Sequence, residues 1–471
     1  MGREETAGDL AIVLHSHMPY VEGFGTYPFG EEWLFDAVIR SHLPVLEVAR
    51  DLTMTVTPVL ADQLEDPGVR ERLREFLVRW RIGAADADAP EVEAECRAAC
   101  EAEGERYRRA LAQLDGAGGD PLRLFREAQL EGRVELATSS ATHAVLPLLA
   151  TRAGIGLQLD AGVRSHRRRF GWGGGLWLPE CAYAPGLEWR LRERGVRWFC
   201  VDQSRHQAEP LAALAPVATA AGPVALPIDW EAVRWLWALD GYPSDPAHAE
   251  FTGESWRGTR IWKVGGGAYD PAVAEGVAIR QGREFLAAVA ARLREFSAAR
   301  GRRGLLVFAV DTELLGHWWS EGPIWLRAVL EGAEAAGVRL LSASRALAEH
   351  EPVQAPLAAS TWGEGKDMRT WDSSVTADLV WAARRLELRL ARAIAAGLRG
   401  DAAARAAREL LAVQASDWAF LDKRGEAGDY AFQRATAHAE AMLEAIDSRS
   451  DTDPCMRSLA PDLSIAPLLE A

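Results

Sequence analysis

Two acidic residues each follow a short apolar segment, and each lies beside tryptophan. Glu180 stands in the run GGGLWLPECAY at residues 173–183. Asp311 follows the apolar residues 305–310 and precedes TELLGHWW. Glycoside chemistry needs such a pair of carboxyl groups, because one attacks the anomeric carbon or stabilises its charge while the other protonates the leaving oxygen. We therefore expect Glu180 and Asp311 to meet at one glycosidic bond.

Tryptophan is the unusual component of the composition, with 18 residues against 7 tyrosines. Core packing accounts for about half of these indoles in our interpretation, since large aromatic side chains dominate protein cores. The others stand next to polar residues and outside apolar periodic runs: Trp33, Trp177, Trp318, Trp319, Trp362, Trp371 and Trp418. Indole faces stack on the C–H faces of sugars, so these positions favour a carbohydrate ligand.

The elements that would position these residues are short apolar strands that alternate with helical segments. We predict strands at residues 10–15, 52–59, 132–139, 176–179, 196–201, 305–310 and 338–341. Strands that alternate with helices indicate parallel βα units. Without a dinucleotide-binding glycine motif, seven such units favour an α/β fold, an incomplete (β/α)7 TIM-like barrel. Residues at the carboxyl ends of barrel strands face the active site.

The chain divides into three parts in this interpretation. Residues 1–350 form the catalytic barrel, with a helical insertion at about residues 61–115 and a long irregular segment at 203–276. Long loops inside compact domains are usually functional. Residues 351–448 form a C-terminal helical bundle with helices at 374–398, 401–421 and 429–447, and residues 449–471 form a loose tail. Ser416-Asp417-Trp418 does not fit a buried stripe, so we expect it to face the site.

Charge and cysteine content restrict the partners. The formal net charge is -15 and the pI is about 5.3, which argues against a nucleic-acid partner. The amino terminus lacks the features of a signal peptide, and no apolar run has the length of a membrane span, so we expect no membrane partner. Five scattered cysteines favour a reducing cytoplasm. The sequence leaves the oligomeric state open.

Seven motifs in order resemble glycoside hydrolase family 57, most closely its α-1,4-glucan branching enzymes. The resemblance runs from about residue 10 to residue 421. The motifs are HSHMPY at residues 15–20, GEEWL at 30–34, TH at 142–143, WLPE at 177–180, DTELLGHWW at 311–319, STWGE at 360–364 and SDW at 416–418. Several of them are weak alone, but their joint occurrence in one order is specific.

This resemblance implies a retaining mechanism without a metal or another cofactor. Glu180 would be the nucleophile and Asp311 the general acid/base, acting on an α-1,4-glucan in glycogen or related α-glucan biosynthesis. The family further implies that the sugar subsites are lined by His15, His17, Trp33, His143, Trp262 and Trp418. To these we add Trp177, His317, Trp318 and Trp362 from their place in the motifs, and Trp371 at the end of the loop at residues 360–371.

The sequence is also compatible with other functions. Branching members carry a shielding tyrosine on a loop after the fifth strand, whereas this chain has none between Tyr183 and Tyr242. An α-amylase or a 4-α-glucanotransferase of the same family is therefore an alternative, as is a catalytically weak glucan-binding protein. In a further alternative, His15 and His17 bind zinc together with Asp311, as an HxH motif does at the end of a first barrel strand.

Overall fold

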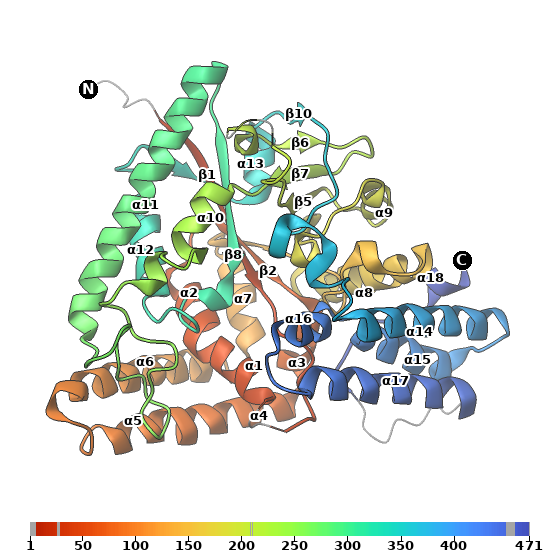
Figure 1. Ribbon diagram of the computed structural model, residues 1–471, viewed down its shortest axis with the longest axis horizontal. Coiled ribbons are helices and arrows are strands. Elements are labelled where there is room, and N and C mark those ends of the chain that lie inside the picture. Colours follow the sequence, from red (N-terminus) through yellow and green to blue (C-terminus); the bar gives the residue numbers. More distant parts are fainter. Residues whose placement is uncertain (1–5, 26–28, 208, 210, 449–456, 471) are drawn as a thin grey trace.

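The strands form two five-stranded sheets, seen in the computed structural model of residues 6–25, 29–207, 209, 211–448 and 457–470 (Figure 1). One sheet has the order β3-β2-β1-β8, with β9 also paired to β1, and the other has the order β10-β6-β7-β5-β4. All pairs within the sheets are parallel except β6 with β7. The strands are β1 (Gly8–Ser16), β2 (Leu52–Val56), β3 (Val134–Ala137), β4 (Gly175–Leu176), β5 (Trp198–Val201), β6 (Val217–Ala218), β7 (Val224–Pro227), β8 (Leu305–Asp311), β9 (Val338–Leu340) and β10 (Val353–Gln354).

The two sheets join at both sides, which confirms the incomplete (β/α)7 barrel. Thr138, just after β3, forms a parallel bridge with Leu176 of β4. On the other side the Asp229 amide donates to the carbonyl of Val307 in β8 at 2.9 Å. The barrel strands are therefore β1, β2, β3, β4, β5, β7 and β8.

The identity of one barrel strand differs from our expectation. We expected residues 338–341 to be the seventh strand, but β9 pairs only with the start of β1. Its place is taken by β7, which lies inside the segment that we interpreted as irregular. β7 has four residues and no long helix between it and β5, so the alternation of strand and helix gives no signal there.

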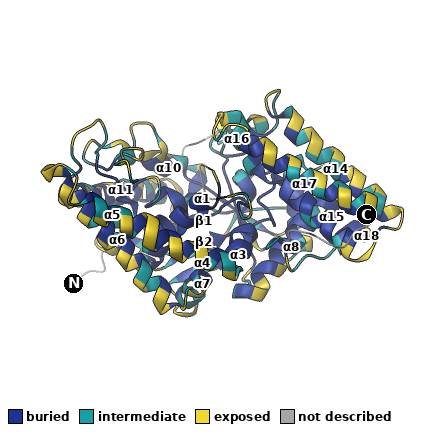
Figure 2. Ribbon diagram, turned by 90° about the horizontal axis from the view of Figure 1, so that it is seen from below, coloured by how far each residue is buried: buried dark blue, intermediate teal, exposed yellow. Residues whose placement is uncertain are grey.

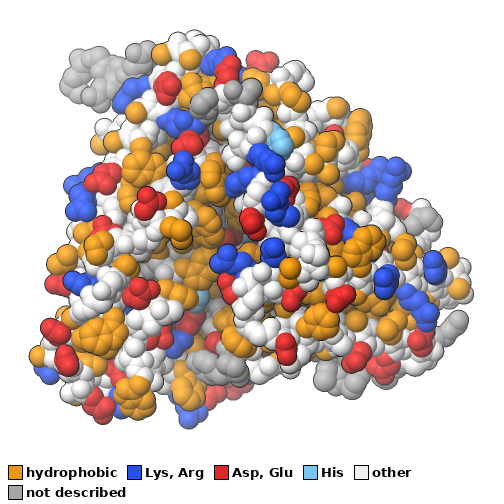
Figure 3. All heavy atoms as spheres, in the orientation of Figure 1, with side chains coloured by type: hydrophobic (Ala, Val, Ile, Leu, Met, Phe, Trp, Pro, Cys, Tyr) orange, Lys and Arg blue, Asp and Glu red, His pale blue; other side chains and the backbone are white. Residues whose placement is uncertain are grey.

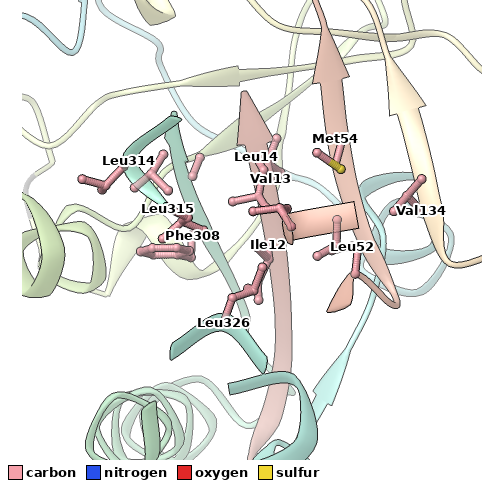
Figure 4. Close-up of a cluster of buried hydrophobic side chains, with 14 of the residues drawn as sticks. Ile12, Val13, Leu14, Leu52, Met54, Val134, Phe308, Leu314, Leu315 and Leu326 are labelled. Atoms are coloured by element: carbon pink, nitrogen blue, oxygen red, sulfur yellow. The ribbon is translucent and has the colours of Figure 1, made fainter. Parts of the chain in front are cut away.

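The core is built around β1, which is buried along its whole length. Its continuous apolar run is typical of a parallel strand that is covered on both faces. Figure 4 shows Ile12, Val13 and Leu14 of β1 between side chains of β2 and β8, such as Met54 and Phe308. The helices that cover the sheets are α1 (Glu31–Ala37), α2 (Leu43–Val48), α7 (Pro121–Leu130), α8 (Arg152–Phe170), α9 (Leu187–Glu193), α10 (Trp230–Trp237), α11 (Pro271–Arg300), α12 (Gly322–Gly332) and α13 (Ala343–Glu349).

The helical insertion begins directly after β2. The predicted strand at residues 52–59 ends at Val56, because Pro58 opens α3 (Pro58–Glu65), and proline suits the first turn of a helix. The insertion continues with α4 (Pro67–Phe76), α5 (Gly83–Asp88) and α6 (Arg97–Gly116), along the lower edge of Figure 1.

The C-terminal helices form a separate lobe at the opposite end from the insertion, with buried β1 and β2 between them (Figure 2). They are α14 (Ala377–Ala395), α15 (Gly400–Val413), α16 (Ser416–Arg424) and α17 (Tyr430–Ser448). The helix that we expected at residues 401–421 is broken before Ser416. The break is fixed from the barrel side, since Ala415 bridges to Ala144 and the Ser416 amide donates to the His143 carbonyl at 3.2 Å.

The end of the chain is packed where the structure describes it, contrary to our expectation of a loose tail. α18 (Ala466–Leu469) contacts α8, and Leu468 is buried. Residues 449–456 and 471 of the expected tail lie outside the described residues. Across the described ranges, none of the helices is both long and apolar enough to cross a membrane.

We predict that Gly162→Ala destabilises the protein. Gly162 lies inside α8, where alanine normally favours the helix, but a Cβ there would meet the Ser139 carbonyl oxygen at 2.2 Å. Forcing a methyl group into such a close backbone approach costs roughly 1–3 kcal/mol. Thermal unfolding should show a lower Tm for Gly162→Ala, whereas Gly276→Ala in exposed, open surroundings in α11 should leave Tm unchanged or raise it. Equal behaviour of both variants would contradict this close approach.

Candidate active site

Glu180 lies in a strained turn just beyond β4. Its backbone has φ 60° and ψ 20°, and Cys181 follows with φ 50°. Both angles are in the left-handed region, which non-glycine residues seldom adopt and which functional sites often use. His143 has φ 60° as well. The fold therefore holds two residues of the expected site in unfavourable backbone conformations.

The carboxylate of Glu180 accepts one hydrogen bond on each oxygen. The Ser416 hydroxyl donates to Oε1 and the Trp362 indole Nε1 donates to Oε2, both at 2.8 Å. His143 Nδ1 lies 3.6 Å from Oε1. Burial raises the pKa of Glu180 to about 7, against the effect of the two donors. These donors fix the orientation of the carboxylate and favour its charged form.

Asp311 ends β8 on the same edge of the sheet. It is in register with His15 of the neighbouring strand β1. Burial raises its pKa well above the ordinary aspartate value, and the nearby charges of Glu313, Glu180 and Asp417 raise it further. Burial and these anions therefore favour the protonated form of Asp311, whereas Glu180 has two donors that favour its charged form, a difference typical of an acid and a nucleophile that work together.

Three histidines form a stack that reaches Glu180 through His143. The His15 ring packs on Trp177 with centroids 4.5 Å apart, and the His17 and His143 rings stack at 4.0 Å. His15 Nε2 lies 2.9 Å from His143 Nε2, and His15 Nδ1 lies 2.5 Å from the Thr55 hydroxyl. Burial lowers the pKa values of His15 and His143. Both rings are therefore neutral, and one donates to the other.

The C-terminal lobe reaches the site through the first turn of α16. His17 Nε2 lies 3.0 Å from Asp417 Oδ1, and Nδ1 lies 3.1 Å from the Thr57 hydroxyl. Burial lowers the pKa of His17, but the charges of Asp417, Glu313 and Glu180 outweigh it and raise the pKa above the usual value. His17 and Asp417 thus form an ion pair between the barrel and the lobe.

The contacts of His15 argue against the alternative in which His15, His17 and Asp311 bind zinc. Both ring nitrogens of His15 already face protein partners, Thr55 and His143, so neither is free to bind zinc together with Asp311. In the part of the chain that the structure describes, one group could contact a metal ion: His17, His143 and Asp417, whose ligand atoms lie within 4.8 Å of one another. Each of these side chains has a hydrogen-bond partner inside the group or next to it.

Four other expected sugar contacts keep at least part of their side chains exposed to solvent. Trp362 is partly exposed and packs edge-on against Trp177 at 5.1 Å. Trp33 packs against Tyr430 at 5.4 Å. Trp318 is 41% exposed beside Trp237, and Figure 3 shows hydrophobic side chains in the central hollow of this face. The carbonyl of partly buried His317 accepts from Arg260, so the backbone of this rim segment is anchored.

The structure buries three of the expected sugar contacts and packs the fourth, the partly exposed Trp262, against the helical insertion. Trp371 and Trp418 are each only 1% exposed, and the Trp418 indole donates to the Ala412 carbonyl at 2.7 Å. Trp177 is fully buried and supports His15. Trp262 packs on the apolar cluster that includes Cys100 of the insertion. The three buried indoles fill interior space, because their large apolar rings complete the packing between the elements.

Some residues that contact the site were not named from the sequence. Ser416 and Asp417 stood only within a segment expected to face the site, yet each binds a site residue directly. Glu313 Oε1 accepts from His42 Nε2 at 2.6 Å and from the His17 amide at 3.2 Å. Thr55 and Thr57 could have been predicted from the sequence, because they are polar residues at the end of the buried strand β2.

A parallel barrel with two partly buried carboxyl groups and aromatic side chains at the carboxyl ends of its strands is an architecture of enzymes that cleave or transfer glycosides. The chain belongs to glycosyl hydrolase family 57, whose profile matches residues 11–358. A second profile, the C-terminal domain of 1,4-alpha-glucan branching enzymes, matches residues 379–460.

Alignments with similar proteins cover almost the whole chain. A 1,4-alpha-glucan branching enzyme of Thermococcus kodakarensis is 34% identical over 92% of this chain and 72% of its own. The crystal structure of a GH57-type branching enzyme from Pyrococcus horikoshii aligns with TM-score 0.89 and 30% identity, covering 98% of this chain and 93% of that one. An alpha-amylase of Thermotoga maritima aligns with TM-score 0.84 and 25% identity, covering 95% and 94%.

We predict that Asp417→Asn lowers the pKa of His17 below its ordinary value of 6.5. Asp417 is the nearest anion to this ring, and without its charge burial becomes the dominant influence. NMR titration of ¹⁵N-labelled histidine rings measures the change. Asp429→Asn, an exposed change in the same lobe, is the control and should leave the His17 titration where it was. An unchanged pKa in Asp417→Asn would contradict the ion pair.

Proposed function

We propose that the protein is a retaining 1,4-α-glucan branching enzyme with Glu180 as the nucleophile and Asp311 as the general acid/base. The observation that supports this most is the contrast between the surroundings of the two partly buried carboxyl groups. Glu180 receives a hydrogen bond on each oxygen, whereas the surroundings of Asp311 favour its protonated form. A nucleophile must be ionised and an acid must carry a proton, which matches this assignment.

The reaction then has two steps. Glu180 attacks the anomeric carbon of an α-1,4-linked glucan, the bond to the glycosidic oxygen breaks, and the proton of Asp311 moves to that oxygen. In the second step Asp311 takes the proton of an incoming hydroxyl, whose oxygen displaces Glu180. A 6-hydroxyl of another chain gives an α-1,6 branch, whereas water gives hydrolysis. The two displacements together retain the anomeric configuration.

The histidine stack and the rim aromatics have supporting roles in this proposal. We assign sugar contacts to His15, His17 and His143, to Trp362 on Glu180, and to Trp33, His317 and Trp318. The Trp177 ring stacks on the His15 ring and so holds it in place. The ion pair of His17 with Asp417 holds the C-terminal lobe over the cleft, which helps to exclude water from the glucosyl-enzyme.

The match of residues 379–460 to the branching-enzyme C-terminal domain favours branching over hydrolysis. The alternative is an alpha-amylase, since the amylase from Thermotoga maritima shares the fold at TM-score 0.84. The chain has no tyrosine between Tyr183 and Tyr242 to shield the intermediate, which is the feature that favours this alternative. We further propose a cytoplasmic enzyme acting in α-glucan biosynthesis, as the four described cysteines are free thiols.

Product analysis separates these functions. We expect amylose incubated with the enzyme to gain α-1,6 linkages, detected by debranching and chain-length analysis, with few new reducing ends. Many new reducing ends without branches would make it an amylase. New α-1,4 chain lengths without branches would make it a 4-α-glucanotransferase, and glucan binding without turnover would exclude an enzyme.

We predict that Glu180→Gln lowers kcat on the order of 10³-fold or more, because the amide cannot form the glycosyl-enzyme. Asp311→Asn should lower kcat by about 10²- to 10⁴-fold for a glucan, the size of general acid–base catalysis. The decrease in kcat of Asp311→Asn should be smaller for a substrate whose leaving group needs no proton. Glu364→Gln, in the partly exposed loop after Trp362, is the control. Near-normal activity of a folded Glu180→Gln or Asp311→Asn would refute the assigned roles.

A further inference from the structure

A buried ammonium group ties the end of β5 to the loop that carries Trp362. Lys366 Nζ lies 2.8 Å from Asp202 Oδ2 and 2.9 Å from the centre of the Trp230 ring, and it donates to the Trp362 carbonyl at 3.2 Å. The Asp202 side chain is fully buried and that of Lys366 is 17% exposed. Neither residue belongs to the catalytic machinery assigned above.

The loop around Lys366 is a closed turn. Lys366 has φ 58° and follows Gly365 with φ 67°. The Lys366 amide donates to the Gly363 carbonyl at 3.0 Å, and its carbonyl accepts from the Thr361 amide at 3.2 Å. Since the turn is closed on itself, an anchor at the Lys366 side chain holds the whole segment from Thr361 to Lys366.

Trp362 stands in this turn and contacts Glu180 twice. Its amide donates to the Glu180 carbonyl at 3.0 Å, and its indole donates to Oε2 at 2.8 Å. Gln203, next to Asp202, holds the preceding residues through a 2.7 Å hydrogen bond to the Ser360 hydroxyl. The position of the indole N–H thus depends on how β5 holds the loop.

We propose that Asp202 and Lys366 are a positioning pair, which fixes the loop so that the Trp362 indole stays on the carboxylate of Glu180. The pair does not touch the substrate and acts through Trp362. Its effect on turnover rests on the proposed role of Glu180, whereas its effect on the indole does not.

The pair acts through position and not through a direct charge effect. The charged or titratable groups that face Glu180 are His143, His17, Asp417 and Asp311. Those that face Lys366 are Asp202 and the Cys181 thiol. Burial lowers the pKa of Lys366, and Asp202 opposes this. Without Asp202 the buried ammonium loses its only described anionic partner, and the loop loses its anchor.

The kinetic test compares three variants by the pH dependence of kcat/KM. Trp362→Phe removes a donor to Glu180, so its acidic limb should move upward by about one pH unit, the size expected for one hydrogen bond to a charged oxygen. Asp202→Asn and Lys366→Met should move the limb in the same direction. Combining Asp202→Asn with Trp362→Phe should add no further shift, because both changes remove the same hydrogen bond.

Arg205→Met is the matched control. Arg205 also holds this loop, donating to the Gly365 carbonyl at 2.6 Å, but its side chain is 51% exposed and it pairs with Asp367 and not with Asp202. It should keep the acidic limb of the wild type. Lys366→Arg should recover part of the shift, as it retains the cation.

A second readout does not need turnover. Selective ¹⁵N-tryptophan labelling gives one indole signal for Trp362, assigned by its loss in Trp362→Phe. In the wild type this signal should titrate with Glu180, and in Asp202→Asn it should move and lose that titration. If the wild type has no glucan activity but the signal behaves in this way, the positioning pair stands and the proposed function fails.

Two results would overturn the proposal. One is a folded Asp202→Asn or Lys366→Met variant with a wild-type acidic limb and an unchanged Trp362 signal. The other is an additive shift in the double variant, which would show that the pair and Trp362 act independently. Because either single variant can be used, loss of folding in one of them leaves the other as the test.

Discussion

The active site depends on taking one carboxylate out of water without neutralising it. Glu180 is nearly buried, so it stays available as an anion only if donors replace the water that burial removes. Those donors come from chain segments far apart in sequence: Trp362 from the loop after the barrel and Ser416 from the first turn of α16. The barrel alone therefore cannot complete the site. The C-terminal lobe has to be docked on it, and the break before α16 is the local feature that makes this possible.

The same burial has opposite consequences at the two carboxyl groups. Asp311 has neighbouring anions and no donor among the described contacts, so burial and repulsion keep its proton in place. Glu180 has donors on both oxygens and a charged His17 nearby. In the proposed mechanism, one low-dielectric cleft thus supports both an acid and a nucleophile, because the contacts around each group differ. The strained backbone at Glu180 and His143 fits this view, since the surrounding contacts must compensate for conformations that cost free energy.

The sequence correctly predicts that Glu180 and Asp311 stand at the ends of strands, but it predicts the residues that contact them poorly, for physical reasons. Glu180 and Asp311 stand where an apolar strand run ends, a signal that is local in the chain. The long apolar run of β1 likewise predicts a buried parallel strand. By contrast, β7 is too short to show periodicity, and Trp418 looks like a sugar contact because its polar neighbours Ser416 and Asp417 do reach the cleft. An indole shows by its sequence neighbours neither which way it points nor whether a backbone carbonyl satisfies its N–H, as Ala412 does here. Such facts arise only when distant segments pack together.

A covalent glucosyl-enzyme, if it forms at Glu180, can be trapped and located on the chain. A 5-fluoro-α-glucosyl fluoride slows the breakdown of a glycosyl-enzyme, so intact-protein mass spectrometry followed by peptide mapping can locate the attached sugar. The account predicts one sugar per chain, attached to the side chain of Glu180 and absent in Glu180→Gln. A sugar attached to Asp311 or Asp417, or turnover with inversion of the anomeric configuration and no adduct, would contradict it.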